Sequence, residues 1–306
     1  MPDLDDTAGH IARRFQDAGC EVALHVLDLQ TGAELGIDPD APVVLASVFK
    51  IFVALEFYAQ VSAGLIDPAE RMALDPSSLT AGPSGLSVFA DPAVLSLRDL
   101  CLQMMSVSDN AATDLLLARV GLEQVNARLR ACGCSHSLVV HDLRTMFDEM
   151  AVDIGFSDYA RLAAARSGDL GKAALAQSND PGRVDSASAF DPARTNRSTP
   201  REMTQLLRAI WRDEAAPPEA CAKVRAVMAQ QVSSRLGRDL PDGAVVAGKT
   251  GSLTGRVRNE VGVITHANGR AFAVAVFTRA HRPFERVASI EAAIATNASA
   301  AISALR

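Results

Sequence analysis

The sequence predicts an α/β protein of the α+β kind, in which an antiparallel sheet is flanked by helices and carries an inserted all-helical domain. Strand-like runs lie near both ends of the chain, whereas the middle has the apolar spacing of helices. The 306 residues are 48% hydrophobic and 22% charged, which is enough for a buried core and excludes a mainly disordered chain. We therefore expect a discontinuous sheet domain from residues 1–45 and 213–306, and a helical domain from residues 46–212.

The N-terminal part predicts a helix followed by a hairpin. Apolar residues at helical spacing between residues 5 and 18 end at Gly19, a typical stop signal. Residues 21–29 then alternate with a period of two, and residues 33–37 return after a Thr-Gly turn.

The remaining elements follow from the same patterns. Gly, Pro and Ser separate the helical segments expected at 47–63, 97–119, 122–131, 157–176, 200–212 and 217–231. Three strand-like runs come next, at 244–248, 257–266 and 270–280, and a final helix at about 285–304. An Ala-Asn-Gly turn between the last two runs indicates a hairpin.

The charge balance and the start of the chain limit the classes of function. With 30 Lys plus Arg against 36 Asp plus Glu, the net charge of −6 argues against a nucleic-acid partner. The acidic start has none of the features of a secretion signal, and no apolar run is long enough to span a membrane. Five mostly isolated cysteines fit reduced thiols. We expect a cytoplasmic protein that has no membrane association.

A serine and a lysine begin a strongly apolar helix after the buried run 42–46. Ser47 and Lys50 are three residues apart, so a helix places both on one face within hydrogen-bond reach. A serine needs an adjacent base to act as a nucleophile, and a buried lysine, unlike an arginine, can lose its proton. The alternative is an ordinary helix start with a solvated lysine.

Two further polar clusters follow along the chain. Ser108 and Asn110, in a loop between helical runs, can both point into one cleft, although Ser108 can equally cap the helix that begins near Asn110. Lys249 and Thr250 can pair with a substrate carboxylate, and Gly251 allows a substrate backbone to approach. The backbone N–H groups of Ser252 and Ser47 would then form an oxyanion hole. A turn with incidental polar residues is the alternative for this second cluster.

In this order, Ser-Val-Phe-Lys, Ser-Asp-Asn and Lys-Thr-Gly-Ser form the motif set of the penicillin-recognising serine enzymes. The chain resembles class A β-lactamases over nearly its whole length. The resemblance implies a class A β-lactamase-like fold in which Ser47 is acylated, Lys50 is the base or proton relay, and Ser108 passes a proton to the leaving nitrogen. It also implies that the substrate backbone approaches closely at Gly251. The side chains implied to bind the substrate are those of Asn110, Lys249, Thr250 and Ser252.

One part of the family pattern is missing. Class A enzymes hold the hydrolytic water with a Glu-x-x-Leu-Asn loop, and no such sequence occurs between residues 111 and 198. Glu149 is the most natural substitute by residue type, and the other acidic candidates are Asp142, Asp148 and Asp153. We expect the enlarged region 142–198 to rebuild the wall of the pocket.

The sequence therefore predicts a serine hydrolase that forms an acyl-enzyme on a β-lactam, small amide or ester, without a cofactor. A biosynthetic acyltransferase or cyclase, and a β-lactam-binding sensor without turnover, are the alternatives. The Cys132-Gly-Cys134 run is tighter than zinc-binding spacing and follows a helix end, so we expect a structural turn and no metal there.

Overall fold

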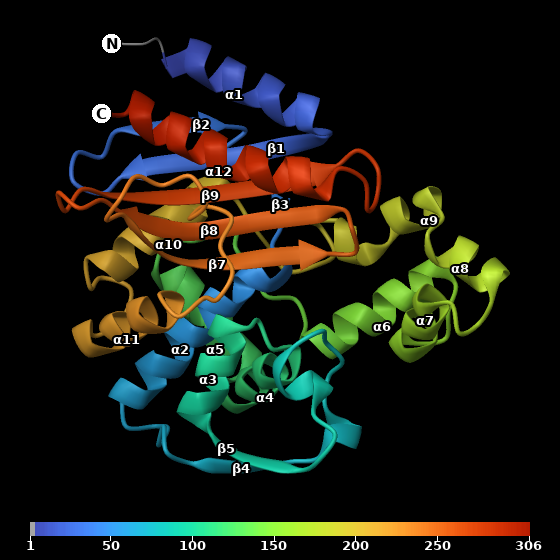
Figure 1. The fold of residues 1–306 in the computed structure, drawn as a ribbon. Helices are drawn as coiled ribbons and strands as arrows, with labels where there is room; N and C mark the ends of the chain where they lie inside the picture. Colours follow the sequence, from blue (N-terminus) through green and yellow to red (C-terminus); the bar gives the residue numbers. More distant parts are fainter. Residues whose placement is uncertain (1–3) are drawn as a thin grey trace.

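A computed structural model describes residues 4–306, and its five-stranded sheet has the order β2-β1-β9-β8-β7 (Figure 1). The strands are β1 (Cys20–Asp28), β2 (Glu34–Ile37), β7 (Val245–Leu253), β8 (Val257–Thr265) and β9 (Ala271–Ala280). All neighbours are antiparallel, and β1 pairs with β9, so both ends of the chain build one sheet. The predicted fold class is confirmed. Residues 1–3, on which the expectation about a secretion signal partly rests, lie outside the described part.

Strand β9 is apolar from Ala271 to Phe277, and the packing of its two faces explains this. Side chains alternate between the two faces of a strand, and β9 is covered on both. Phe272, Val274 and Val276 belong to the core between the sheet and the terminal helices. Ala273 and Ala275 belong to the core on the opposite face, where small side chains allow a helix to approach closely.

Two terminal helices cover one face of the sheet, α1 (Leu4–Ala18) and α12 (Val287–Ala304) (Figure 1). Ile11, Ile290 and Ile294 are buried between these helices and the strands. The expectation that no run is long enough to span a membrane needs correction here, because α12 passes that test by length and composition alone. Its isoleucines pack here as the core face of a sheet-covering helix.

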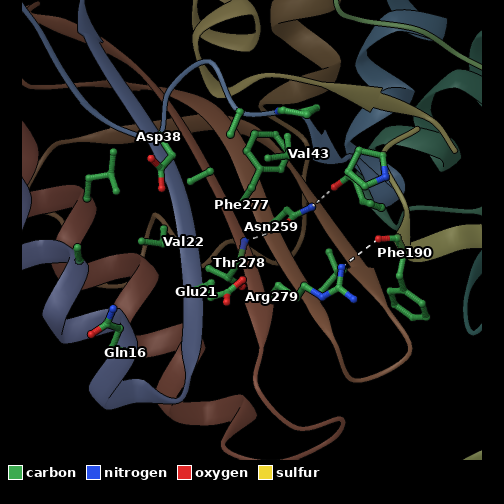
Figure 2. A pocket seen from close by; sticks show the side chains of 18 residues that line it. Gln16, Glu21, Val22, Asp38, Val43, Phe190, Asn259, Phe277, Thr278 and Arg279 are labelled. Atoms are coloured by element: carbon green, nitrogen blue, oxygen red, sulfur yellow. Dashed lines mark hydrogen bonds between the residues drawn. The ribbon is translucent and has the colours of Figure 1, made fainter. Parts of the chain in front are cut away.

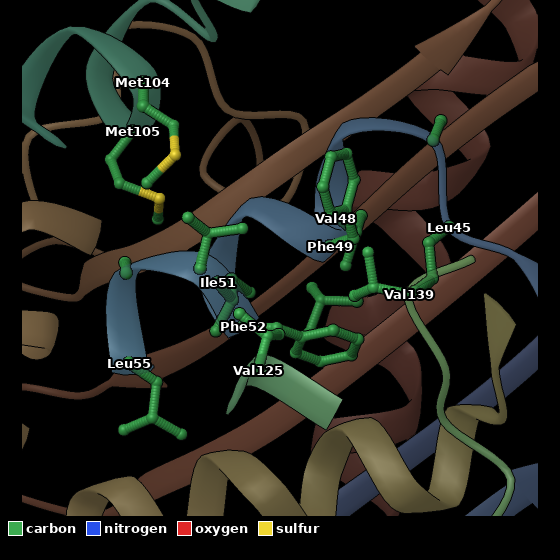
Figure 3. Packing of buried hydrophobic residues seen from close by; sticks show 14 of the residues in the cluster. Leu45, Val48, Phe49, Ile51, Phe52, Leu55, Met104, Met105, Val125 and Val139 are labelled. Atoms are coloured by element: carbon green, nitrogen blue, oxygen red, sulfur yellow. The ribbon is translucent and has the colours of Figure 1, made fainter. Parts of the chain in front are cut away.

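The opposite face is covered by α10 (Pro200–Trp211), which contacts β9 and β1. The sequence assigned this segment to the helical domain 46–212, whereas its apolar side packs on the sheet. Below it lies α2 (Lys50–Ser62), whose residues 50–59 are all buried, as expected of a helix that is apolar all round. Figure 3 shows side chains of α2 packed against neighbouring helices. These neighbours are α3 (Leu97–Ser106), α4 (Asn110–Val120), α5 (Leu122–Ala131) and α11 (Pro218–Met228).

The predicted helix 97–119 is two helices, because Ser108 adopts a left-handed backbone (φ +60°) that ends the first one. Gly168 (φ +90°) likewise divides the predicted helix 157–176. The enlarged region contains α6 (Leu143–Ile154), α7 (Tyr159–Ser167), α8 (Lys172–Ser178) and α9 (Pro181–Ser186), which form a lobe beside the helical block (Figure 1). The small ladders pair β3 (Val43–Val44) with β6 (Arg197–Ser198), and β4 (Arg71–Leu74) with β5 (Ala93–Ser96).

Candidate active site

A cleft of about 400 Å³ lies between the edge strand β7, the start of α2 and the enlarged region. Its lining includes Ser47, Ser108, Asn110, Thr250 and Ser252. The structure thus brings together residues from three motifs that are up to about 200 positions apart in the chain. Lys50 and Lys249 are fully buried beneath this surface.

Ser47 lies on a short 3₁₀ turn, η1 (Ala46–Phe49), that leads directly into α2. Ala46 has a left-handed backbone (φ +47°), which is unfavourable for a residue with a side chain and persists only where surrounding contacts hold it. One such contact comes from the buried Asn259 of β8, whose amide donates to the carbonyl oxygens of Val44 at 2.9 Å and Leu45 at 3.3 Å. The sheet therefore fixes the segment that presents Ser47.

The far side of this segment faces a larger cavity of about 520 Å³ (Figure 2). Figure 2 shows Asn259 among the side chains that line this cavity, with Phe277 and Thr278 nearby. None of the predicted site residues lines this cavity, so its size alone does not make it the active site. The smaller cleft contains the reactive groups.

Lys50 lies at the centre of the buried polar network. Its Nζ donates to the Ser108 carbonyl oxygen (2.7 Å), Ser108 Oγ (3.2 Å) and Asn110 Oδ1 (2.9 Å). Within residues 4–306 these acceptors, and not the Ser47 hydroxyl, take its hydrogen bonds, because the left-handed turn at Ser108 points its carbonyl at the amine. Burial lowers the pKa of Lys50 well below its usual 10.5, and the nearby positive charge of Lys249 lowers it further. The lowered pKa makes the neutral form of Lys50, which can accept a proton, more accessible than it is in a solvated lysine.

In the Ser108-Asp109-Asn110 segment, the helix cap is not the residue that the sequence offered as the alternative. Asp109, and not Ser108, caps α4: its carboxylate accepts from the backbone N–H of Ala112 at 3.1 Å and of Leu86 at 2.6 Å. The hydroxyl of Ser108 is therefore left to face Lys50. Asn110 donates through Nδ2 to the Ala81 carbonyl at 3.0 Å, which fixes the orientation of its amide.

The edge strand β7 supplies the third group. The Thr250 N–H donates to the Gln231 side chain, away from β8, and the alternation of an antiparallel strand directs the Ser252 N–H to the same outer side. Gly251 packs directly against η1: a Cβ atom there would lie 2.7 Å from the Leu45 carbonyl oxygen and 3.3 Å from Ser47 N. This contact sets the backbone of β7 beside the backbone of Ser47, as an oxyanion hole requires.

Lys249 is buried and donates to the Thr250 carbonyl oxygen at 2.9 Å. Burial lowers its pKa to about 7, with Arg235 contributing in the same direction and Glu260 opposing the shift. Sequence reasoning missed Arg235 and Glu260. The Glu260 carboxylate, buried on β8, accepts from Gln231, Ser234 and two backbone N–H groups. The one signal in the sequence was a charged residue inside a strand pattern.

Arg235 belongs to the segment whose backbone N–H groups bind Glu260, and its side chain lines the cleft. Its guanidinium donates to Ser252 Oγ at 2.9 Å and to the Asn259 carbonyl oxygen at 2.9 Å, and pairs with Glu291 at 3.1 Å. Arg235 and Ser252 both line the cleft, where they can bind an anionic group of a ligand.

The structure does not bring Glu149 to the cleft. This side chain is 51% exposed and lies 3.9 Å from His141 Nε2. The other acidic candidates have local roles: Asp142 caps α6, Asp148 accepts from Tyr159 N, and Asp153 accepts from Ser188 N. Within residues 4–306 the cleft lining contains no carboxylate.

The enlarged region forms the cleft wall with apolar, aromatic and basic side chains. These are Leu143, Met146, Phe147, Tyr159 and Arg166. The region thus lines the pocket as predicted, but with helices α6 and α7 in place of an acidic loop.

Across residues 4–306 no three His, Cys, Asp or Glu side chains are grouped to hold a metal ion. Cys132 and Cys134 belong to the turn after α5, where Cys134 is buried, and neither lines the cleft.

Together, the sheet, the helical block and the cleft at the edge strand define a class A β-lactamase-like fold. The chain belongs to the β-lactamase enzyme family, since the family model described as "Beta-lactamase enzyme family" matches residues 7–305.

The chain is similar to proteins with two kinds of name. It is 34% identical over 305 residues to the "Beta-lactamase regulatory protein BlaB" of Streptomyces cacaoi, which covers 93% of this chain and 94% of that protein. The β-lactamase structure from Sphaerobacter thermophilus has a TM-score of 0.76 and 26% identity, covering 99% of this chain and 98% of that one. A β-lactamase structure from Chitinophaga pinensis, at 20% identity and a TM-score of 0.77, covers 98% and 100% and is similar in fold.

Proposed function

We propose that this protein opens a β-lactam, or a related small amide or ester, by transferring its acyl group to Ser47. The observation that carries the proposal is the fully buried Lys50, with its lowered pKa, bonded to Ser108 directly beneath a cleft that contains Ser47. A buried amine bonded to a serine hydroxyl is suited to proton transfer and is costly as a merely structural feature.

Each polar group of the site has one role in the proposed acylation step. Ser47 Oγ attacks the carbonyl carbon while its proton passes to the free lone pair of Lys50 in its neutral form, and the backbone N–H groups of Ser47 and Ser252 stabilise the oxyanion. The C–N bond then breaks, and the proton returns through Ser108 to the leaving nitrogen. The product is an ester between Ser47 and the acyl group, with one new N–H bond.

Release of the acyl group is expected to be slow. Hydrolysis of the ester needs a base that holds a water, and the cleft lining within residues 4–306 has no carboxylate for this. This observation, with the similarity to a protein named as a regulator, favours a second candidate function: a sensor in which the acyl adduct reports the presence of a β-lactam. An acyltransferase, in which an amine takes the acyl group, is the third alternative from the sequence.

Intact-mass measurement of the protein mixed with benzylpenicillin tests these functions. We expect a mass increase equal to the mass of the whole β-lactam, because the leaving nitrogen stays attached to the acyl group after ring opening. We also expect the adduct to persist for many minutes. Faster loss of the adduct after addition of an amine acceptor indicates acyl transfer, and rapid loss to water indicates a true hydrolase. The absence of any adduct at millimolar benzylpenicillin contradicts the proposal.

The close packing of Gly251 against η1 gives one prediction. Gly251→Ala is expected to slow acylation about 100-fold, the effect of losing one oxyanion donor, because the added methyl group pushes β7 away from Ser47. The acylation rate constant with benzylpenicillin measures this. Gly9→Ala is the control, since the Cβ there meets only ordinary contact. Equal rates for Gly251→Ala and the wild type would mean that β7 does not supply the oxyanion hole.

The lowered pKa of Lys249 predicts a pH dependence. Lys249 is protonated below pH 7 and neutral above it, so its attraction for a substrate carboxylate decreases as the pH rises through about 7. We expect the ratio of kcat/KM for a carboxylate-bearing substrate to that for a matched neutral ester to fall across this range. Any effect of Lys50 cancels in the ratio because both substrates need the same base. A ratio that is constant from pH 6 to 9 contradicts the role of Lys249.

A further inference from the structure

We propose that Arg166 forms a subsite for a second carboxylate, carried on the acyl side chain of the ligand. This inference rests on the proposed acylation of Ser47 and specifies which ligands react best. It starts from the enlarged region of the chain, which the family motifs do not describe, and from one guanidinium group in the cleft wall.

Arg166, on α7, lies beside the C-terminal end of β7, whereas the predicted carboxylate site lies near Lys249 and Thr250, earlier in the same strand. Lys249 and Thr250 lie at one end of the motif, and Ser252 beside Ser47 marks the position of the reacting carbonyl. Arg166 Nη1 lies 3.5 Å from Thr254 Oγ1, two residues beyond Ser252. A ligand that runs along the strand with one carboxylate near Thr250 and its carbonyl at Ser252 therefore carries its acyl side chain toward Arg166.

The guanidinium of Arg166 lacks a counterion in the described chain. Its Nε and Nη2 atoms are buried without a hydrogen-bond partner, and no acidic side chain of residues 4–306 pairs with it within 4.0 Å. A buried cationic donor without a partner is unfavourable. Arg235, which lines the same cleft, has Glu291, Ser252 and a carbonyl oxygen as partners. Among the described residues, Arg166 is thus the cleft arginine that has no acidic partner and two nitrogen atoms without an acceptor.

The surroundings of Arg166 add a shape preference. Phe147 of α6 and Tyr159 of α7 line the cleft with it, and their rings stack at a centroid distance of 4.7 Å and an angle of 21°. Flat aromatic faces favour contact with an aromatic group, and a guanidinium favours a carboxylate through paired N–H bonds. The chemical class that fits both is an aryl acyl group that bears a carboxylate.

Two penicillins that differ by one carboxylate test this subsite. Benzylpenicillin and α-carboxybenzylpenicillin share the ring system and the phenyl group. We expect the wild-type protein to be acylated about tenfold faster by the carboxylated compound, as measured by intact mass in competition. Arg166→Gln is expected to remove this preference, and Arg166→Lys to keep part of it because a positive charge remains.

The control is Arg161→Gln on the same helix, where the side chain is exposed and outside the cleft; its preference is expected to match that of the wild type. A preference that survives in Arg166→Gln, or a wild-type protein that reacts equally with both compounds, overturns the subsite while acylation itself stands. Failure of both compounds to form an adduct overturns the proposed function, and the subsite with it. The ratio of the two rates is insensitive to partial unfolding of a variant, because inactive molecules react with neither compound.

Discussion

Ser47→Ala is expected to abolish the acyl adduct and to reduce turnover of activated esters and β-lactams at least about 10⁴-fold. The reason is that the variant loses the atom that forms the covalent bond, while the hydrogen bonds from the Asn259 amide to the backbone carbonyl oxygens of Val44 and Leu45, just before η1, do not involve the Ser47 side chain and remain. Intact mass and steady-state hydrolysis measure the two effects. Because the side chain is small and partly exposed, the thermal midpoint is expected to change little.

Ser186→Ala is the matched control, since it removes an exposed hydroxyl on α9 far from the lining of the cleft. It is expected to keep the wild-type rate. Undiminished activity in Ser47→Ala would refute the acyl-enzyme mechanism, and an adduct in that variant would place the nucleophile on another residue.

The second large effect is expected at Lys50. Lys50→Arg is predicted to be as damaging as Lys50→Ala, with acylation reduced about 10³-fold or more in both. Arginine keeps the positive charge but stays protonated at all working pH values, so it cannot accept the proton of Ser47. The pre-steady-state acylation rate measures this, and in the wild type it is expected to rise with pH through the lowered pKa of Lys50.

Because Lys50 is fully buried, a bulkier arginine can also disturb packing. Lys50→Met, of similar length and uncharged, separates the two effects: it is expected to fold with a thermal midpoint at or above that of the wild type and still fail to acylate. Lys223→Arg, on the exposed side of α11, is the control. Substantial acylation by Lys50→Arg would show that Lys50 supplies charge and that another group is the base.

The sequence predicted the sheet and most helices well, because alternation with a period of two and helical spacing are local patterns. It failed where tertiary contacts decide the backbone. Helical spacing alone joins residues 97–119 into one segment, whereas the Ser-Asp-Asn motif indicated a loop within it. The chain adopts a left-handed turn at Ser108, whose carbonyl oxygen and hydroxyl bind Lys50. Similarly, α10 has the pattern of any amphipathic helix, and only packing shows that its apolar side lies on the sheet.

The candidate site was predicted in its motifs and incompletely in its surroundings. Ser47, Ser108 and Ser252 meet in one cleft, as the resemblance to class A β-lactamases implies. Residue type suggested Glu149 as a base, but α6 turns that side chain toward His141. Arg166 and Arg235 carried no distinguishing pattern among 26 arginines, so their positions in the cleft follow from the fold alone.

The sequence by itself determined the antiparallel sheet built from both ends, the three motifs and the choice of lysine at two of them. These features depend on residue type and short spacing. The tertiary structure decided the electrostatics: burial lowers the pKa values of Lys50 and Lys249, and Asp109 takes over the helix cap. Within residues 4–306 the cleft wall presents an arginine that has no acidic partner, in place of a carboxylate. The physical reason is that the charge state of a group depends on what surrounds it in space, and those neighbours come from distant parts of the chain.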